Sequence, residues 1–300
     1  HKEYRRQRQM CIRDRLRTVT GLRFDQYNAK VTSHWQTQNS GSAVASKVSP
    51  KFSVIVGPWQ KTEFFINSGK GFHSNDARGA TAKADPKTGL PIDAVPGLVR
   101  SRGQEVGVKS QLVPNLNTTL AIWRLDFDSE LIYVGDAGTT EAGRPSRRSG
   151  VEWSNHWTPG DRLWMDAHFA WTRPRYSDND PAGNAIPNAV QKVANFTFAV
   201  RHGGPWSGSL GVRYIGTAPL IEDSSVRSKA SVTANLRVNR KISSDLDVAL
   251  DILNLTDRKN NDISYVYSSR VAGEPPQGVP GVHVHPAEPR TFRATAKIRF

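Results

Sequence analysis

The chain has 300 residues, of which 37% are hydrophobic, which is enough for two soluble domains or one large β domain. No apolar run reaches about 18 residues, so the sequence predicts no transmembrane helix. The formal net charge is +14, but no helix-turn-helix, zinc-finger or RNA-binding motif accompanies it. We therefore expect no nucleic-acid partner.

The first residues differ from the rest of the chain. Residues 1–17 hold seven Lys and Arg against two acidic residues, a net charge of +5. The stretch around Cys11, the single cysteine, has no periodicity and resembles a translated sequencing adapter. We expect residues 1–15 to be artefactual or disordered and residues 16–300 to form the fold. With no initial Met and no signal-peptide core, we expect an N-terminal part to be missing.

Apolar and polar residues alternate along most of the chain. Between residues 163 and 171, for example, apolar side chains at the odd positions oppose Asp166 and His168. Successive side chains of a β-strand point to opposite faces, so this period predicts strands. Similar segments are 193–201, 206–216, 230–238, 246–252 and 290–300. No segment shows the helical spacing over a useful length, so the predicted fold class is all-β.

The expected connections alternate between short and long. The short ones lie at residues 57–61, 113–116, 158–162, 202–205 and 242–245. The long ones lie at residues 29–50, 73–100, 135–145, 174–191, 217–227 and 258–288. Outer-membrane barrels have short periplasmic turns and longer extracellular loops. The pattern predicts about twelve strands of a transmembrane antiparallel β-barrel, with Phe300 on the periplasmic side.

The last strand has one apolar and one cationic face. Its apolar positions are Phe292, Ala294, Ala296 and Ile298, and Arg293, Thr295, Lys297 and Arg299 alternate with them. In a barrel wall the apolar side faces lipid and the polar side faces the lumen. A closing strand that ends on Phe300 resembles the assembly signal of bacterial outer-membrane barrels, which implies the barrel-assembly machinery as a partner. Basic loops would face the phosphates of lipopolysaccharide.

Four segments resemble barrel motifs of the TonB-dependent outer-membrane receptors. They are residues 63–79, 135–141, 251–257 and 283–300. One departure is Thr256, where the family usually has Phe or another apolar residue. Such receptors have 22 strands around a plug. The resemblance implies that this chain is the C-terminal half of one barrel, about 12 of 22 strands, with the plug domain missing.

The resemblance also implies a function. It would be active uptake of a scarce ligand across the bacterial outer membrane, most often a ferric siderophore or another metal chelate. The energy would come through TonB–ExbB–ExbD, with no enzyme activity and no cofactor. Three alternatives remain open: a passive porin-like channel, an outer-membrane barrel enzyme, and a soluble β-sandwich or lectin-like binding protein.

Few residues are candidates for a site. His73, Asn75, Asp76 and Arg78 occupy an expected outer loop, where Arg and His could bind an anionic chelate through charge-assisted hydrogen bonds, unless the loop only packs on itself.

Two other groups are weaker. His283 and His285 could ligate a metal together with Glu288, although packing is the favoured interpretation. Asp166 and His168 could form a dyad only if a nucleophile joined them, and two polar lumen positions are the favoured interpretation. We predict no catalytic residues and no resident metal.

Overall fold

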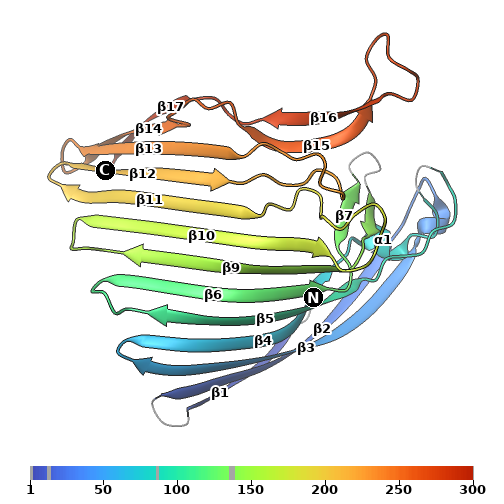
Figure 1. Cartoon of the computed structure of the whole chain (residues 1–300), viewed down its shortest axis with the longest axis horizontal. Coiled ribbons are helices and arrows are strands. Elements are labelled where there is room, and N and C mark those ends of the chain that lie inside the picture. Colours follow the sequence, from blue (N-terminus) through green and yellow to red (C-terminus); the bar gives the residue numbers. More distant parts are fainter. Residues whose placement is uncertain (1–2, 12–14, 86–87, 135–138, 300) are drawn as a thin grey trace.

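The computed structural model describes residues 3–11, 15–85, 88–134 and 139–299. Thirteen strands form one antiparallel sheet in which sequential strands are neighbours, with β1 and β17 at its two edges (Figure 1). The sheet is therefore an open section of barrel wall. Its strands are β1 (Glu3–Cys11), β2 (Leu16–Val31), β3 (Gly41–Trp59), β4 (Thr62–Ser74), β5 (Leu98–Ser110), β6 (Leu116–Phe127), β9 (Ser146–Trp157), β10 (Leu163–Tyr176), β11 (Lys192–Gly203), β12 (Trp206–Ile215), β13 (Ser231–Lys241), β14 (Leu246–Leu253) and β17 (Thr291–Ile298).

The remaining elements lie in the connections. Two hairpins are separate two-stranded sheets: β7 (Leu131–Val134) with β8 (Thr139–Ala142), and β15 (Asn261–Ser269) with β16 (Val279–Pro286). Two short helices, η1 (Thr37–Asn39) and α1 (Ala77–Thr81), complete the fold. No helix in the described part of the chain has the length and apolarity needed to cross a membrane.

The predicted fold class is confirmed. The sheet is all antiparallel, and it has twelve strands besides β1. The N-terminal segment differs from the expectation of disorder, because Glu3–Cys11 forms β1 and pairs with residues 17–25 of β2 along its whole length. A domain boundary at residue 16 stays a prediction.

Two expected long connections contain more strand than the pattern suggested. The β2–β3 ladder runs from Leu16↔Val56 to Val31↔Gly41, so only residues 32–40 connect the two strands. Residues 258–288 include the β15–β16 hairpin. Ladder bonds join backbone groups, so small and polar side chains such as those of residues 41–47 can pair without a clear apolar period.

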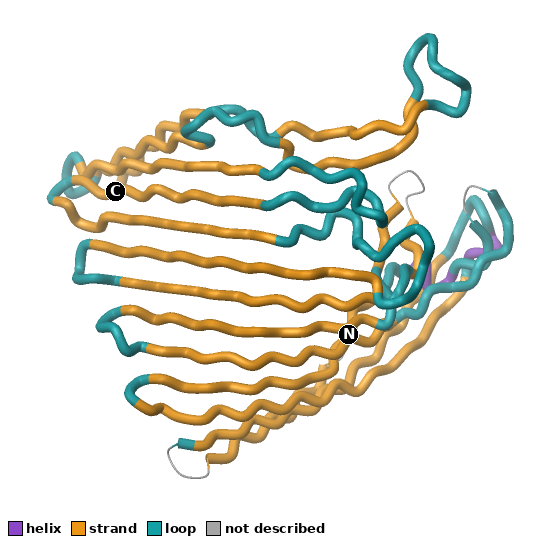
Figure 2. The backbone as a smooth tube through the Cα atoms, viewed as in Figure 1, coloured by secondary structure: helices purple, strands orange, loops and turns teal. Residues whose placement is uncertain are grey.

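The two ends of the sheet differ as the sequence predicted. Short turns join the strands at one end, on the left of Figure 1, where the chain also ends. The long connections, both helices and the β7–β8 hairpin lie at the opposite end (Figure 2). We call these the turn end and the loop end. Phe300 itself lies outside the described residues.

The two faces of the sheet are chemically opposite. On the outer face, apolar side chains are exposed, among them Ile66, Ile122 and Phe292. On the lumen face, polar groups are the more buried: Asp251 is 5% exposed. It accepts hydrogen bonds from Arg237 (3.0 Å) and from Arg293 of β17 (3.1 Å). Arg293 therefore shares this polar face and Phe292 lies opposite Ile252 on the apolar face, as the alternation predicted, while the lipid and lumen assignments of the two faces stay predictions.

Candidate functional site

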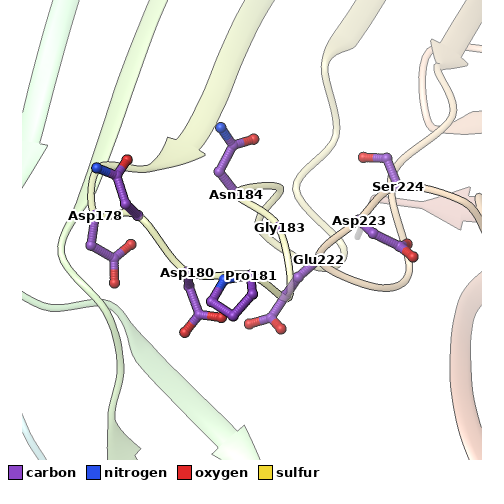
Figure 3. A pocket seen from close by; sticks show the side chains of 9 residues that line it. Asp178, Asp180, Pro181, Gly183, Asn184, Glu222, Asp223 and Ser224 are labelled. Atoms are coloured by element: carbon purple, nitrogen blue, oxygen red, sulfur yellow. The ribbon is translucent and has the colours of Figure 1, made fainter.

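The loops that follow β10 and β12 line an acidic cavity at the loop end that is open to solvent. Its volume is about 510 Å³, within the range of roughly 300–1,000 Å³ that is typical of small-molecule sites. In Figure 3 its carboxylates come from two separate stretches of chain. Its lining residues are Asp178, Asn179, Asp180, Pro181, Gly183, Asn184, Glu222, Asp223 and Ser224.

Arg144, which precedes β9, joins the two loops. Its Nε and Nη2 donate to the carboxylate of Asp178 at 2.8–3.0 Å, and its Nη1 donates to the carbonyl oxygen of Gly183 at 2.9 Å. The same Nη1 lies 3.5 Å from Glu222 Oε1. The guanidinium also lies over the ring of Tyr176, 4.3 Å from its centroid. One cation therefore links three segments of the loop end.

Backbone hydrogen bonds also join the two loops, and we call this contact between them the loop junction. The N–H of Ala185 donates to the carbonyl oxygen of Glu222 at 2.9 Å, and the N–H of Asn188 donates to that of Pro219 at 2.8 Å. Gly183, two residues before Ala185, has φ +114°, and a Cβ at this position would lie 2.3 Å from the backbone oxygen of Glu222. Only glycine fits both the conformation and the space.

The cavity is negatively charged at neutral pH. Hydrogen bonds from Arg144 hold the pKa of Asp178 below its usual range. The backbone N–H of Ser225, followed by its hydroxyl, does the same for the pKa of Asp223. Both groups stay ionised and accept hydrogen bonds. The cavity therefore favours cationic, amine or hydroxyl groups and repels free anions.

The predicted loop site at residues 73–78 is largely occupied by its own contacts. Asn75 is buried, and its Nδ2 donates to the Pro96 carbonyl oxygen at 2.7 Å. Asp76 caps α1 by accepting from the N–H of Arg78 at 2.8 Å, and it also pairs with that guanidinium at 2.9 Å. These bonds from Arg78 lower the pKa of Asp76. The His73 ring packs 5.7 Å from that of Phe127.

The two histidines of β16 do not converge. His283 stacks on Tyr267 with ring centroids 3.7 Å apart, and His285 lies opposite Ile263 in the β15–β16 register. Within residues 3–11, 15–85, 88–134 and 139–299, no three His, Cys, Asp or Glu side chains form a group that could hold a metal. The weak metal candidates remain without a third ligand there.

Asp166 and His168 are not joined as a dyad by any contact in the described part. Asp166 instead lies 2.7 Å from Nδ1 of His156 on the neighbouring strand β9. Opposite residues of adjacent strands meet more closely than i, i+2 neighbours along one strand, so the cross-strand pair forms.

Sequence reasoning missed the residues of the acidic cavity. The signal was present: Asp178 and Asp180 fall in one long connection, and Glu222 and Asp223 fall in the next. Every second connection of an antiparallel sheet lies at the same end, which brings the β10–β11 and β12–β13 connections and their carboxylates close together. Arg144 had no comparable signal, because it is one of 41 Lys and Arg residues.

With a section of barrel wall and a set of outer loops in place, the class of the protein follows. Residues 7–255 match the family model described as TonB dependent receptor-like, beta-barrel. The chain belongs to this family, whose barrels are outer-membrane proteins and whose members are transporters rather than enzymes. The predicted resemblance is confirmed.

Particular relatives are more distant. The chain is 24% identical over 286 residues to the metal-pseudopaline receptor CntO of Pseudomonas aeruginosa, covering 90% of this chain and 38% of that protein. It is 24% identical to the ferrichrome receptor FcuA of Yersinia enterocolitica, covering 61% and 24%. The chain thus spans less than half the length of these curated relatives.

Solved structures confirm the fold. The ferric yersiniabactin uptake receptor FyuA of Yersinia pestis superposes with a TM-score of 0.75 at 14% identity, covering 99% of this chain and 45% of that one. The ferric-catecholate import receptor Fiu of E. coli K12 superposes with a TM-score of 0.71 at 19% identity, covering 97% of this chain and 43% of that one.

Proposed function

We propose that this chain is part of the barrel of an outer-membrane receptor that takes up a metal chelate. The observation that carries the proposal is the family match over residues 7–255. The relatives support a chelate as the ligand, since their names specify metal-pseudopaline, ferrichrome and ferric yersiniabactin. In this role the wall spans the bacterial outer membrane, and the loop end faces the outside.

The ligand-binding surface in this proposal is the loop end. Two parts of it differ in charge: the acidic cavity, and the residue 73–78 segment with Arg78, whose side chain is 70% exposed. The cavity would accept hydrogen bonds from hydroxyl and amine groups of a chelator. Arg78, which pairs with Asp76 in the structure, would bind carboxylate or catecholate oxygens of the ligand by exchanging these bonds. His73 and Asn75 would hold that segment in place through their contacts with Phe127 and Pro96.

The partners follow from the same proposal. Transport would be driven by TonB with ExbB–ExbD, acting on a plug and a TonB-contacting segment of the complete receptor. The barrel-assembly machinery would insert the wall, with Phe300 as part of its signal. The chain's own residues do no covalent chemistry in this scheme.

Uptake experiments test the proposal. The complete gene product that contains this chain is expressed in a bacterial strain that lacks its own siderophore receptors. Radioactive iron is supplied as a catecholate and as a hydroxamate chelate. We expect accumulation of at least one chelate, and its loss when the tonB gene is deleted. Uptake that persists without TonB would instead support a passive channel, and failure to accumulate either chelate would contradict the ferric-chelate class.

A further inference from the structure

The loop end contains a second contact between connections, besides the loop junction. It joins the connection between β2 and β3 to the connection between β4 and β5. Asn39 lies at its centre: its Nδ2 donates to the carbonyl oxygen of Ala84 at 2.9 Å, and its Oδ1 accepts from the N–H groups of Lys83 and Ala84 at 2.8 Å each. One amide side chain thus makes three hydrogen bonds to the neighbouring connection. We call this contact the Asn39 junction.

Further contacts make the Asn39 junction a small packed unit. Nε2 of Gln36 donates to the carbonyl oxygen of Asp85 at 3.1 Å, and the hydroxyl of Thr81 donates to the carbonyl oxygen of Asn39 at 3.3 Å. Thr81 and Ala84 are both buried. Segments with buried side chains and shielded hydrogen bonds open less often than segments without them. The two connections therefore protect each other from solvent.

The loop junction is built in the same way, from one central side chain and several backbone bonds. Arg144 contacts both connections, through Asp178 of the first and Glu222 of the second. Each connection also contributes a buried apolar side chain, Ile186 from the first and Leu220 from the second. Separation of the two connections would break the bonds of Arg144 to one of them. Neither connection is therefore expected to keep its shape without the other.

The two junctions lie at different places along the rim of the wall. The Asn39 junction lies above β2 to β5, and the loop junction lies above β10 to β13 (Figure 1). The nearest strands of the two groups, β5 and β10, are separated by β6 and β9, which is about 14 Å at about 4.8 Å per strand. Sites that are more than about 7–10 Å apart usually contribute independently. The loop end therefore contains two separate pairs of connections.

We propose that the loop end opens and closes as these two pairs of connections, and not as single loops. Each junction makes its two connections one cooperative unit, so that both lose their protection together when the central contact breaks. The acidic cavity is lined from both sides of the loop junction, so its walls stay together while one pair moves against the other. This behaviour does not depend on the chelate that the loop end binds.

Hydrogen exchange tests the proposal in the complete receptor that contains this chain, in detergent and without added chelate. The side chain of Arg144 is 16% exposed, and Arg144→Gln removes its charge-assisted bonds to Asp178. We expect the amides of both connections of the loop junction, residues 177–191 and 216–230, to exchange at least about tenfold faster in this variant. The amides of the Asn39 junction should exchange as in the wild type.

Asn39→Ala should give the reverse pattern, so each variant is the control for the other. It removes the three bonds of the Asn39 side chain, and residues 32–40 and 88–97 should exchange faster together. Exchange of residues 177–191 and 216–230 should stay at the wild-type rate.

Arg124→Gln is a matched control in the wall, because Arg124 also pairs with an aspartate, Asp126, at 2.8 Å. It should leave exchange in both pairs unchanged. Faster exchange in only one connection of a pair, in both pairs at once, or in neither would overturn the proposal, as would an equal effect of Arg124→Gln. Resistance of the barrel to SDS at room temperature confirms folding. A junction variant that fails this check is replaced by Asp178→Asn for Arg144→Gln, or by Asn39→Asp for Asn39→Ala.

Discussion

The wall and the loop end of this protein are held together in different ways. In the wall, ladder bonds join every neighbouring strand, and the face of each side chain follows from its parity. At the loop end, individual contacts decide the arrangement, such as the Arg144 bonds to Asp178 and Gly183. A single change should therefore act through its face in the wall and through its particular partner in the loops. Four predictions sharpen this contrast.

The largest effect is expected from a charge on the outer face of the wall. Ala296 lies opposite Val248 on the lipid side of β17, and Thr295 lies opposite Ala249 on the lumen side. Ala296→Lys should destabilise the receptor by about 2–4 kcal/mol if this position lies near mid-membrane, whereas Thr295→Lys should cost little. Urea unfolding of the complete receptor in lipid vesicles measures both. Equal effects of the two substitutions would show that the lipid and lumen faces of β17 are wrongly assigned.

The next effect concerns one glycine of the loop end. Gly183→Ala introduces a Cβ 2.3 Å from the Glu222 oxygen at φ +114°. This substitution should lower the free energy of unfolding by about 1–3 kcal/mol, because the backbone is strained and the two loops are pushed apart. Gly160→Ala is the matched control, since its φ is +94° but nothing lies within 4 Å. Hydrogen exchange of residues 177–191 should rise in the first variant only.

A smaller effect is expected on the lumen face. Asp251→Asn removes the charge that pairs with Arg237 and Arg293. Both arginines are substantially exposed, with side chains 43% and 61% accessible, so screening limits the loss to about 1 kcal/mol. The expected shift of the urea midpoint is small and should shrink further in high salt. A loss as large as that of Ala296→Lys would mean that this pair is shielded from solvent.

The smallest expected effect is a change in the pKa of one carboxyl group, that of Asp178. The folded pKa of Asp178 is below the ordinary aspartate value of 3.8, chiefly because Arg144 donates to it. Its contribution to the loop junction is therefore present above that ordinary value and is lost as the pH falls through the lowered folded pKa. Carboxyl NMR should show Asp178 titrating at higher pH in Arg144→Gln than in the wild type. An unchanged midpoint would exclude Arg144 as the cause.

The same contrast explains what the sequence could predict. The alternation of apolar and polar residues in β10 and in β17 predicted the strands and the face of each side chain. A two-residue period can be recognised directly in the sequence. The β15–β16 hairpin was missed because backbone pairing does not require such a period. The acidic cavity was missed for another reason: Asp178 and Glu222 are 44 residues apart (222 − 178), and their proximity depends on the path of two loops. The sequence predicted a loop from His73 to Arg78, whereas in the structure β4 continues to Ser74 and α1 begins at Ala77. The pairing of Asp76 with Arg78 depends on how this helix begins.

The junction at Gly183 also bears on how such receptors diverge. Loop tips exposed at a cell surface face phages, antibodies and competitors, and they are expected to change quickly. Here the carbonyl oxygens of Glu222 and Pro219 each accept a backbone bond from the neighbouring loop. Side chains at the tips can therefore vary without breaking the junction, but an insertion in one loop shifts its register against the other. Among close relatives, the lengths of these two loops should change together, while their residues change independently.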